Sequence, residues 1–293
     1  MRLKLEFEMH PLNIKYFIDR LQQNKPFMFL KILHGFWEKI DALSPNTSFE
    51  EMISDISQFY QDNVLLEHTT NKYLSEEQDD IYESLEKKTL RNDDRHYIDV
   101  LHMIRTVSLN NMLLGVHYKP WPNAVNVNEN SAINAMNKVL PGVDVYDGHV
   151  LKHACISGQI TNFLKELHNY HVIVIGLYHL ENMNQYLKFN DFTFYGVETP
   201  LASRREQFLV ELKEFHENFK TKKRKVYLVQ LGGSLTTWVG YKCHHFLKDS
   251  FFIDAGRAID IWGAPETTPH QFWLGSINDK LMEIYKNKQI KLI

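Results

Sequence analysis

The chain has few cysteines, little net charge and no long hydrophobic run. Its 293 residues contain two cysteines, Cys155 and Cys243, without a CxxC pair or metal-ligand spacing. This excludes a disulfide framework and favours buried thiols in a reducing compartment. A formal net charge of −3 gives no overall attraction to nucleic acid or to an anionic membrane. No stretch reaches the roughly 18 apolar residues that a membrane-spanning helix needs, so we expect no membrane span.

The N-terminus also lacks the features of a secretory signal. Residues 1–8 alternate polar and apolar side chains and include acids, where a signal peptide has an uninterrupted apolar run. We therefore expect a cytoplasmic location, which for a viral protein would be the host cytoplasm. With 44% hydrophobic and 24% charged residues and no repeat, the chain can bury a sizeable core.

Apolar runs and helical segments alternate in the C-terminal half. The runs expected to form strands are His171–Gly176, Asp191–Val197, Val226–Leu231 and Phe251–Asp254. The helical segments between them are Leu180–Leu187, Ala202–Lys220 and Ser234–Leu247. Strands that are apolar throughout and alternate with helices are typical of a parallel sheet covered on both faces. The sequence therefore predicts an α/β fold with a Rossmann-like, mostly parallel sheet.

The N-terminal half is mostly helical in pattern. Apolar residues recur at spacings of three and four in Leu12–Gln23, Phe36–Ala42, Ser48–Asn63, Ser75–Leu90 and Asp94–Leu114. Residues 26–33 form a short aromatic-rich run that predicts a buried strand, residues 117–145 are loop-like, and residues 149–168 are helical. We expect one domain over residues 1–293, with a helical insertion or cap at about 41–115.

Residues able to bind ligands follow each predicted strand of the C-terminal half. They are Gly176; Glu198, Pro200, Ser203 and Arg204; Gly232, Gly233 and Ser234; and Asp254, Gly256 and Asp260. Because parallel strands all end at one edge of a sheet, these turns are expected to meet there, where α/β sheets bind their ligands.

Two of these turns suit phosphate groups. Gly232 and Gly233 end an apolar run and precede a helix at Ser234, so free N–H groups could face a phosphate while Asp254, about 20 residues on, reaches a ribose. Ser203 and Arg204 stand at another helix start, where they could share a pyrophosphate. The alternatives are that the glycines serve packing alone, and that Glu198 and Ser203 cap the following helix.

The order of these motifs resembles the GT-D fold glycosyltransferases. The resemblance covers about half the chain and is carried by Val172–Gly176, Phe194–Pro200, Leu231–Thr237, Asp254–Gly256 and the apolar-acidic tail 258–261. In that family an early strand leads to an Asp-x-Glu motif that positions a divalent metal on the donor diphosphate. The run from Phe29 to Glu38 occupies the corresponding place here, with Gly35 as the preceding glycine.

The resemblance implies Glu38 as the motif glutamate and as a ligand of Mn²⁺ or Mg²⁺, but Phe36 stands where the family has aspartate. A single carboxylate holds such an ion weakly. His34, one helical turn from Glu38, is an alternative partner, Glu38 could instead act as a base, and Lys31 could neutralise phosphate without a metal. We therefore expect Glu38, His34 and Lys31 near the reacting centre.

The function that the resemblance implies is transfer of a sugar from a nucleotide-sugar, with UDP as the first choice, to an acceptor hydroxyl. The acceptor would be a glycan or glycoconjugate, or a hydroxylated base in viral DNA contacted by Lys222–Lys225. The basic run 220–225 is otherwise a solvated helix end. Two alternatives remain: an inactive nucleotide-binding or interaction module, and a metal-dependent hydrolase that uses His149 and His153, which are spaced i, i+4. The sequence does not predict an oligomeric state.

Overall fold

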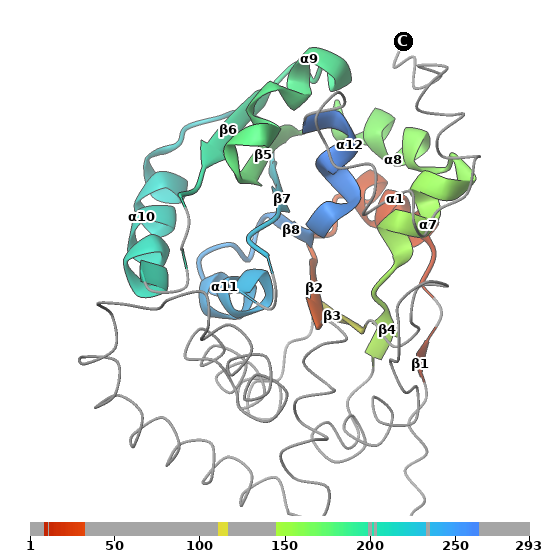
Figure 1. Ribbon diagram of the computed structural model, residues 1–293, viewed down its shortest axis with the longest axis horizontal. Helices are drawn as coiled ribbons and strands as arrows, with labels where there is room; N and C mark the ends of the chain where they lie inside the picture. Colours follow the sequence, from red (N-terminus) through yellow and green to blue (C-terminus); the bar gives the residue numbers. More distant parts are fainter. Residues whose placement is uncertain are drawn as a thin grey trace, which may run out of the picture.

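The computed structural model describes residues 9–10, 12–32, 111–116, 145–198, 201, 204–232 and 235–263. Within these residues one eight-stranded sheet has the order β1-β4-β3-β2-β8-β7-β5-β6 (Figure 1). Its strands are β1 (Met9–His10), β2 (Met28–Ile32), β3 (Met112–Val116), β4 (Val145–Asp147), β5 (His171–Gly176), β6 (Phe192–Gly196), β7 (Lys225–Val229) and β8 (Phe251–Asp254). Every neighbouring pair is parallel, which confirms the predicted α/β fold class.

Helices cover both faces of this sheet. They are α1 (Ile14–Gln22), α7 (Val150–Ser157), α8 (Ile160–Leu167), α9 (Asn184–Leu187), α10 (Arg205–Asn218), α11 (Leu235–Cys243) and α12 (Asp260–Gly263), with the 3-10 helices η3 (Tyr178–Met183) and η5 (Gly256–Ile259). Figure 1 shows α1, α7 and α8 grouped on one side of the sheet and α10 and α11 on the other. Strands covered in this way are buried on both faces, as in β5 and β8, where every residue is buried.

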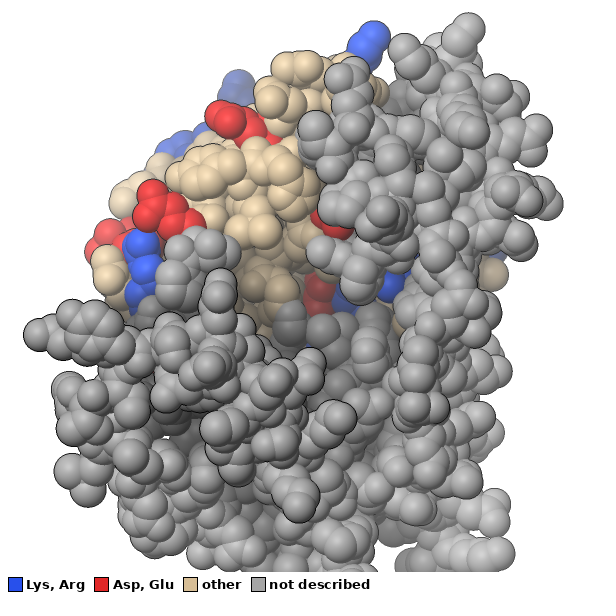
Figure 2. Space-filling model, in the orientation of Figure 1, with Lys and Arg blue, Asp and Glu red and all other residues tan. Residues whose placement is uncertain are grey.

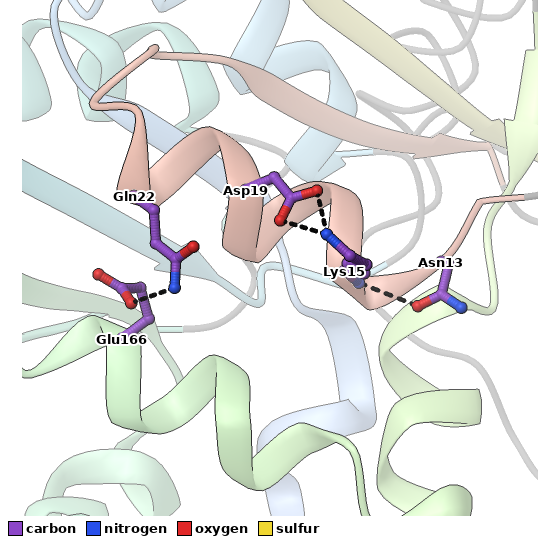
Figure 3. Close-up of polar contacts among 5 residues, drawn as sticks. All are labelled: Asn13, Lys15, Asp19, Gln22 and Glu166. Carbon is purple, nitrogen blue, oxygen red and sulfur yellow. Dashed lines mark hydrogen bonds and ion pairs between the residues drawn. The ribbon is translucent and has the colours of Figure 1, made fainter.

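The helix α1 illustrates how local sequence sets these elements. Asn13 caps it, because its side-chain oxygen accepts a hydrogen bond from the Lys15 backbone N–H at 2.9 Å (Figure 3). Ile14, Phe17 and Leu21 recur at helical spacing and are buried, which places one apolar stripe against the sheet and α8. The ring centroids of Phe17 and Phe163 lie 6.2 Å apart, so α1 and α8 share one core.

On the opposite face, α11 lies very close to the centre of the sheet. A Cβ added to Gly240 would overlap the Leu30 side chain of β2 and would lie 3.1 Å from the Phe252 ring of β8. Glycine at this position therefore allows close helix–strand contact, while Trp238 on the same helix is fully buried. This contact fixes the position of α11 relative to the ends of β2 and β8.

Three sequence predictions differ from the structure. Residues 112–114, predicted as the end of a helix, belong to β3. This strand lies between β2 and β4 in the sheet, so its backbone N–H and C=O groups form ladder hydrogen bonds on both sides. Val145, predicted as loop, begins β4. The single helix predicted over 149–168 is two helices, since Gly158 has φ +74° and ends α7 in the left-handed conformation. The predicted insertion at about 41–115 reaches into β3, and its residues 41–110 lie outside the described residues.

The predicted absence of a membrane span is confirmed for the described part of the chain. None of its helices is both long and apolar enough to cross a bilayer.

Candidate functional site

The carboxyl ends of β2 and β8 form a branch point of the sheet. These strands are neighbours, yet the chain leaves β2 for β3 on one side and reaches β8 from β7 on the other. After β8 the chain continues through η5 into α12, which packs on η3 near the end of β5. Connections that diverge in this way open a crevice at the carboxyl edge, where α/β proteins bind ligands.

A buried ion pair lies at this branch point. Lys31 Nζ, on β2, is 3.2 Å from Asp254 Oδ1, on β8, and the two side chains are only 6% and 4% exposed. Burial raises the pKa of Asp254, while the Lys31 ammonium and the backbone N–H groups of Lys31 and Gly256 partly offset this effect. Burying two charges costs free energy that an apolar pair would avoid, so stability alone does not explain why this pair is buried.

Gly256 makes room for this pair. Its φ is +49°, and a Cβ at this position would lie 2.5 Å from Lys31 Nζ. The predicted ligand residue Gly256 therefore contributes by its lack of a side chain, which allows the ammonium to approach the backbone.

The glycine turn that opens α11 lies beside the ion pair. Gly232 has φ +77° with open space where a Cβ would be, so the turn itself requires glycine. The Leu231 N–H donates to Thr236 Oγ1 at 3.1 Å, and Thr237 Oγ1 donates to the Lys31 carbonyl oxygen at 2.5 Å. The first turn of α11 is thus tied to the end of β2. Gly233 and Ser234 lie outside the described residues.

Other predicted site residues have structural partners of their own. A Cβ on Gly176 would meet Leu180 at 2.7 Å, so this glycine allows η3 to pack against the end of β5. Arg204 NH2 donates to Glu211 Oε1 at 3.1 Å, and Arg204 NH1 lies 4.0 Å from Glu198 Oε2. Arg204 therefore pairs with its own helix and would have to release Glu211 to bind phosphate. Pro200 and Ser203 lie outside the described residues.

A histidine that the sequence interpretation did not select completes the carboxyl edge. His179 Nε2, on η3, is 3.1 Å from Asp260 Oδ1, on α12, and their side chains are 31% and 7% exposed. Gln230 Nε2 donates to the same oxygen at 2.5 Å. The carboxylate of Asp260 therefore orients an imidazole that solvent can reach, which is the arrangement of a general base.

Gln230 also has an unsatisfied atom at this site. Its Oε1 is buried without a hydrogen-bond partner among the described residues. Leaving a buried acceptor unpaired costs about 1–3 kcal/mol, so the site favours a ligand with a hydrogen-bond donor here. His179 and Gln230 were missed because both stand singly in ordinary helix and strand patterns. Their positions were nevertheless a signal, because His179 stands three residues after the apolar run of β5 and Gln230 directly after that of β7.

The histidines of the alternative hydrolase lie at the end of β4. Asp147 Oδ1 accepts from the His149 N–H at 2.8 Å, and Asp147 Oδ2 lies 3.2 Å from His153 Nδ1. Asp147 thus fixes the start of α7 and orients His153. No group of three or more His, Cys, Asp or Glu side chains in the described ranges could hold a metal ion, so the hydrolase interpretation gains no support from them.

Of the three predicted catalytic residues, only Lys31 lies within the described residues; His34 and Glu38 do not. The structure brings together Lys31, Asp254 and Gly256, and it places Asp260 with His179. On the face drawn in Figure 2, charged side chains are sparse across the described surface and gather over α10.

No protein-family model, curated protein or solved structure matches this chain.

Proposed function

We propose that this protein is a glycosyltransferase that moves a sugar from a nucleotide-sugar, most simply a UDP-sugar, to an acceptor hydroxyl. The observation that carries the proposal is the buried Lys31–Asp254 pair, which stands at the branch point of the sheet next to the glycine turn of α11. A departing diphosphate needs positive charge and N–H donors. Lys31 and the first turn of α11 supply both at one place.

The chain offers separate groups for the two ends of the donor. Lys31 would neutralise the diphosphate, and Asp254 would accept hydrogen bonds from ribose or sugar hydroxyls. The unsatisfied Oε1 of Gln230 can accept a further hydrogen bond, from an N–H or O–H group of the nucleotide or sugar. Each role uses a side chain already fixed in place by its neighbours, which lowers the entropic cost of binding.

His179 is suited to deprotonate the acceptor hydroxyl. With its Nε2–H donated to Asp260, its Nδ1 carries the lone pair and can take the hydroxyl proton while the oxygen attacks the anomeric carbon and the diphosphate leaves. Asp260 would then stabilise the imidazolium that forms. Glu38 and His34, expected from the sequence near the reacting centre, are alternative bases.

The described residues do not fit a divalent metal ion. Asp254, the carboxylate nearest the expected diphosphate position, is paired with an ammonium at 3.2 Å, and no cluster of three ligands occurs among the described residues. We therefore assign no step to a metal, and Glu38 remains the predicted ligand if one binds.

The acceptor follows from the resemblance alone. A glycan or glycoconjugate is the first choice, and a hydroxylated base in viral DNA is the second. We also propose a cytoplasmic location, which the two buried free thiols Cys155 and Cys243 support.

The test combines nucleotide binding with turnover. Thermal unfolding is measured with UDP, other nucleoside diphosphates and their sugars, and donor hydrolysis is then assayed with and without Mn²⁺. We expect stabilisation by one nucleotide class, and loss of that stabilisation in Lys31→Met. His179→Gln should keep nucleotide binding but lose about 100-fold or more of the turnover, the usual contribution of a general base.

Three further variants sharpen this result. Asp260→Asn should lower turnover and shift its pH profile, because the amide does not stabilise the imidazolium. Glu38→Ala should lose turnover if Glu38 is the base instead of His179. His245→Gln changes an exposed histidine at the other end of the sheet and should change nothing. Nucleotide binding without turnover in any condition would show an inactive module, and no nucleotide binding would overturn both interpretations.

A further inference from the structure

A groove with a high density of basic residues lies at the edge of the sheet opposite the candidate site. It has a volume of about 980 Å³ and is formed by the C-terminal end of α10, the segment leading into β7 and the turn before β8. We call it the basic groove and define it by its cations, Lys220, Lys222, Lys223, Arg224, Lys225 and Lys248. Because β7 and β8 begin here and end at the candidate site, the basic groove and that site are at opposite ends of the strands.

Most of this positive charge has no carboxylate partner. Of the described residues that line the groove, only Glu217 and Asp249 are acids. Lys223 is paired with Asp191 at 2.7 Å, whereas the other five cations make no ion pair with a carboxylate among the described residues. Three of those five instead donate to backbone carbonyl oxygens: Lys220 to Glu217 at 2.7 Å, Lys225 to His216 at 2.7 Å and Arg224 to Asn24 at 2.6 Å. Carbonyl groups orient these cations but do not cancel their charge.

Burial and the neighbouring positive charges lower the pKa values of two groups in the groove, Lys225 and His216. Burial lowers the pKa of Lys225, and the neighbouring Lys220 lowers it further. Burial lowers the pKa of His216, and Lys225 adds to the effect, while Glu217 and Asp249 oppose it. Lys220 and Lys225 are therefore close enough to repel each other, and a bound anion would relieve that repulsion.

Helix capping accounts for only part of this arrangement. Lysines near the C-terminus of a helix often bind its last carbonyls, and Lys220 and Lys225 do so at the end of α10. Lys222 and Lys248 cap no helix, and both are exposed on the groove. A solvated helix end, the interpretation that the sequence favoured, leaves these two residues unexplained.

Aromatic side chains stand among the cations. Phe219 and Phe246 line the groove and are partly exposed, and Lys225 Nζ lies 5.5 Å from the centroid of the Phe219 ring. Partly exposed rings in a positively charged groove are the features that bind single-stranded nucleic acid, because bases stack on the rings while lysines follow the phosphates. An anionic bilayer would engage the cations but offers no bases to stack on a ring.

We propose that the basic groove binds single-stranded nucleic acid. The phosphodiester backbone lies along Lys222, Arg224 and Lys248, and an unpaired base stacks on Phe246. The Phe219 ring, which stacks on Phe215 and holds Lys225 beside it, supports that wall of the groove. The groove needs no nucleotide-sugar and lies at the other edge of the sheet, so this binding is independent of the proposed transferase activity.

The test is fluorescence anisotropy of the full chain with labelled single-stranded oligonucleotides of about 20 nucleotides, both DNA and RNA, over a range of salt concentrations. We expect binding that weakens linearly with the logarithm of salt concentration. Each lost phosphate contact lowers that slope by about 0.7 for a single strand. The double variant Lys222→Glu, Lys248→Glu should therefore lower it by about 1.4 and bind at least tenfold more weakly. Phe246→Ala should weaken binding with little change in slope.

The matched control for the single variant Lys248→Glu is Lys15→Glu, which makes the same charge change at an exposed position near the start of α1 and should leave binding unchanged. Far-ultraviolet circular dichroism of each variant checks that the fold is intact. Equal weakening by Lys15→Glu and Lys248→Glu would show attraction to total charge and overturn the proposal. Absence of binding at low salt, or tighter binding to anionic vesicles or to duplex than to single strands, would also overturn it. Binding of either single-stranded DNA or single-stranded RNA supports the proposal, and the tighter of the two identifies the kind of nucleic acid that the groove prefers.

Discussion

Gly256 combines two properties that another residue cannot supply. Its φ is +49°, in the left-handed region, and a Cβ would lie 2.5 Å from Lys31 Nζ. We expect Gly256→Ala to strain the backbone and to push the ammonium away from Asp254. The free energy of unfolding should fall by more than about 2 kcal/mol, because left-handed backbone strain of about 1–2 kcal/mol is added to a weakened buried ion pair. Urea unfolding measures the loss.

Gly158→Ala is the matched control for this variant. Gly158 also has a left-handed φ, +74°, but nothing lies within 4 Å of an added Cβ, so only the backbone strain applies. Gly158→Ala should cost about 1 kcal/mol and leave nucleotide stabilisation unchanged, whereas Gly256→Ala should lose it. Equal effects of the two variants would mean that the space beside Lys31 has no functional importance.

At the scale of elements, the close contact between α11 and β2 determines where the glycine turn lies. Gly240→Ala would normally favour a helix by about 1 kcal/mol. Here we expect it to destabilise the protein by about 1–3 kcal/mol, since the new methyl group overlaps Leu30. Chemical unfolding of Gly240→Ala, Leu30→Ala and the double variant checks this. The double variant should be more stable than the sum of the single losses predicts, and simple additivity would contradict the expected overlap.

The sequence predicted those elements whose own residues carry a full apolar run or a full apolar stripe. The continuous apolar runs of β5 and β8 and the stripe of α1 were found within one or two residues of their observed ends. β1 and β4 were missed because strands of two and three residues contain too little pattern. β3 was missed because the apolar residues of Met112–Val116 continue the helical spacing that precedes them. Only the pairing with β2 and β4 shows that the segment is a strand and not a helix.

The candidate site was predicted only in part, because local patterns select single residues but not the contacts between them. Asp254 and Gly256 were selected because they stand at the end of an apolar run, and Lys31 because the resemblance places its strand where the family has its metal motif. Their mutual contact depends on β2 and β8 being neighbours, which the local sequence does not encode. His179 was missed because its importance comes from Asp260, a partner on a different element.

At the scale of the whole molecule, the two ends of the sheet differ in chemistry. The carboxyl ends hold buried or oriented titratable groups, such as Lys31, Asp254 and His179, and the opposite ends of β7 and β8 hold the basic groove. A net charge of −3 for the chain hides this separation. The protein can therefore present one edge to a small ligand and the other to a polyanion without the two competing for space.

This distribution of titratable groups also predicts how stability depends on pH. Burial, with a smaller contribution from Lys152, lowers the pKa of His149 to about 3 from its ordinary value of 6.5. Below about pH 6.5 the unfolded chain binds a proton at His149 that the native protein does not. The contribution of His149 is thus fully present above about pH 6.5 and is lost as the pH falls, by up to about 1.4 kcal/mol per pH unit.

Asp254 has the opposite effect at the acid end of this range. Burial raises its pKa above 3.8, so the native protein keeps this proton more readily than the unfolded chain just above pH 3.8. Its contribution to stability falls as the pH rises through that window. The decrease due to His149 should consequently be clearest between about pH 6.5 and about pH 5.

The measurement is urea unfolding at intervals from about pH 8 to about pH 4.5, a range set by the two opposing pKa shifts. We expect a plateau above about pH 6.5 and a decline below it. His149→Gln, which cannot take up the proton, should make the decline shallower whatever its stability at neutral pH. The part of the decline due to His171 and His216, whose pKa values burial also lowers, should remain. His245→Gln, at an exposed position, should retain the full decline. A decline that is the same in His149→Gln as in the unmodified protein would show that other groups control acid stability, and that His149 is not held neutral by burial.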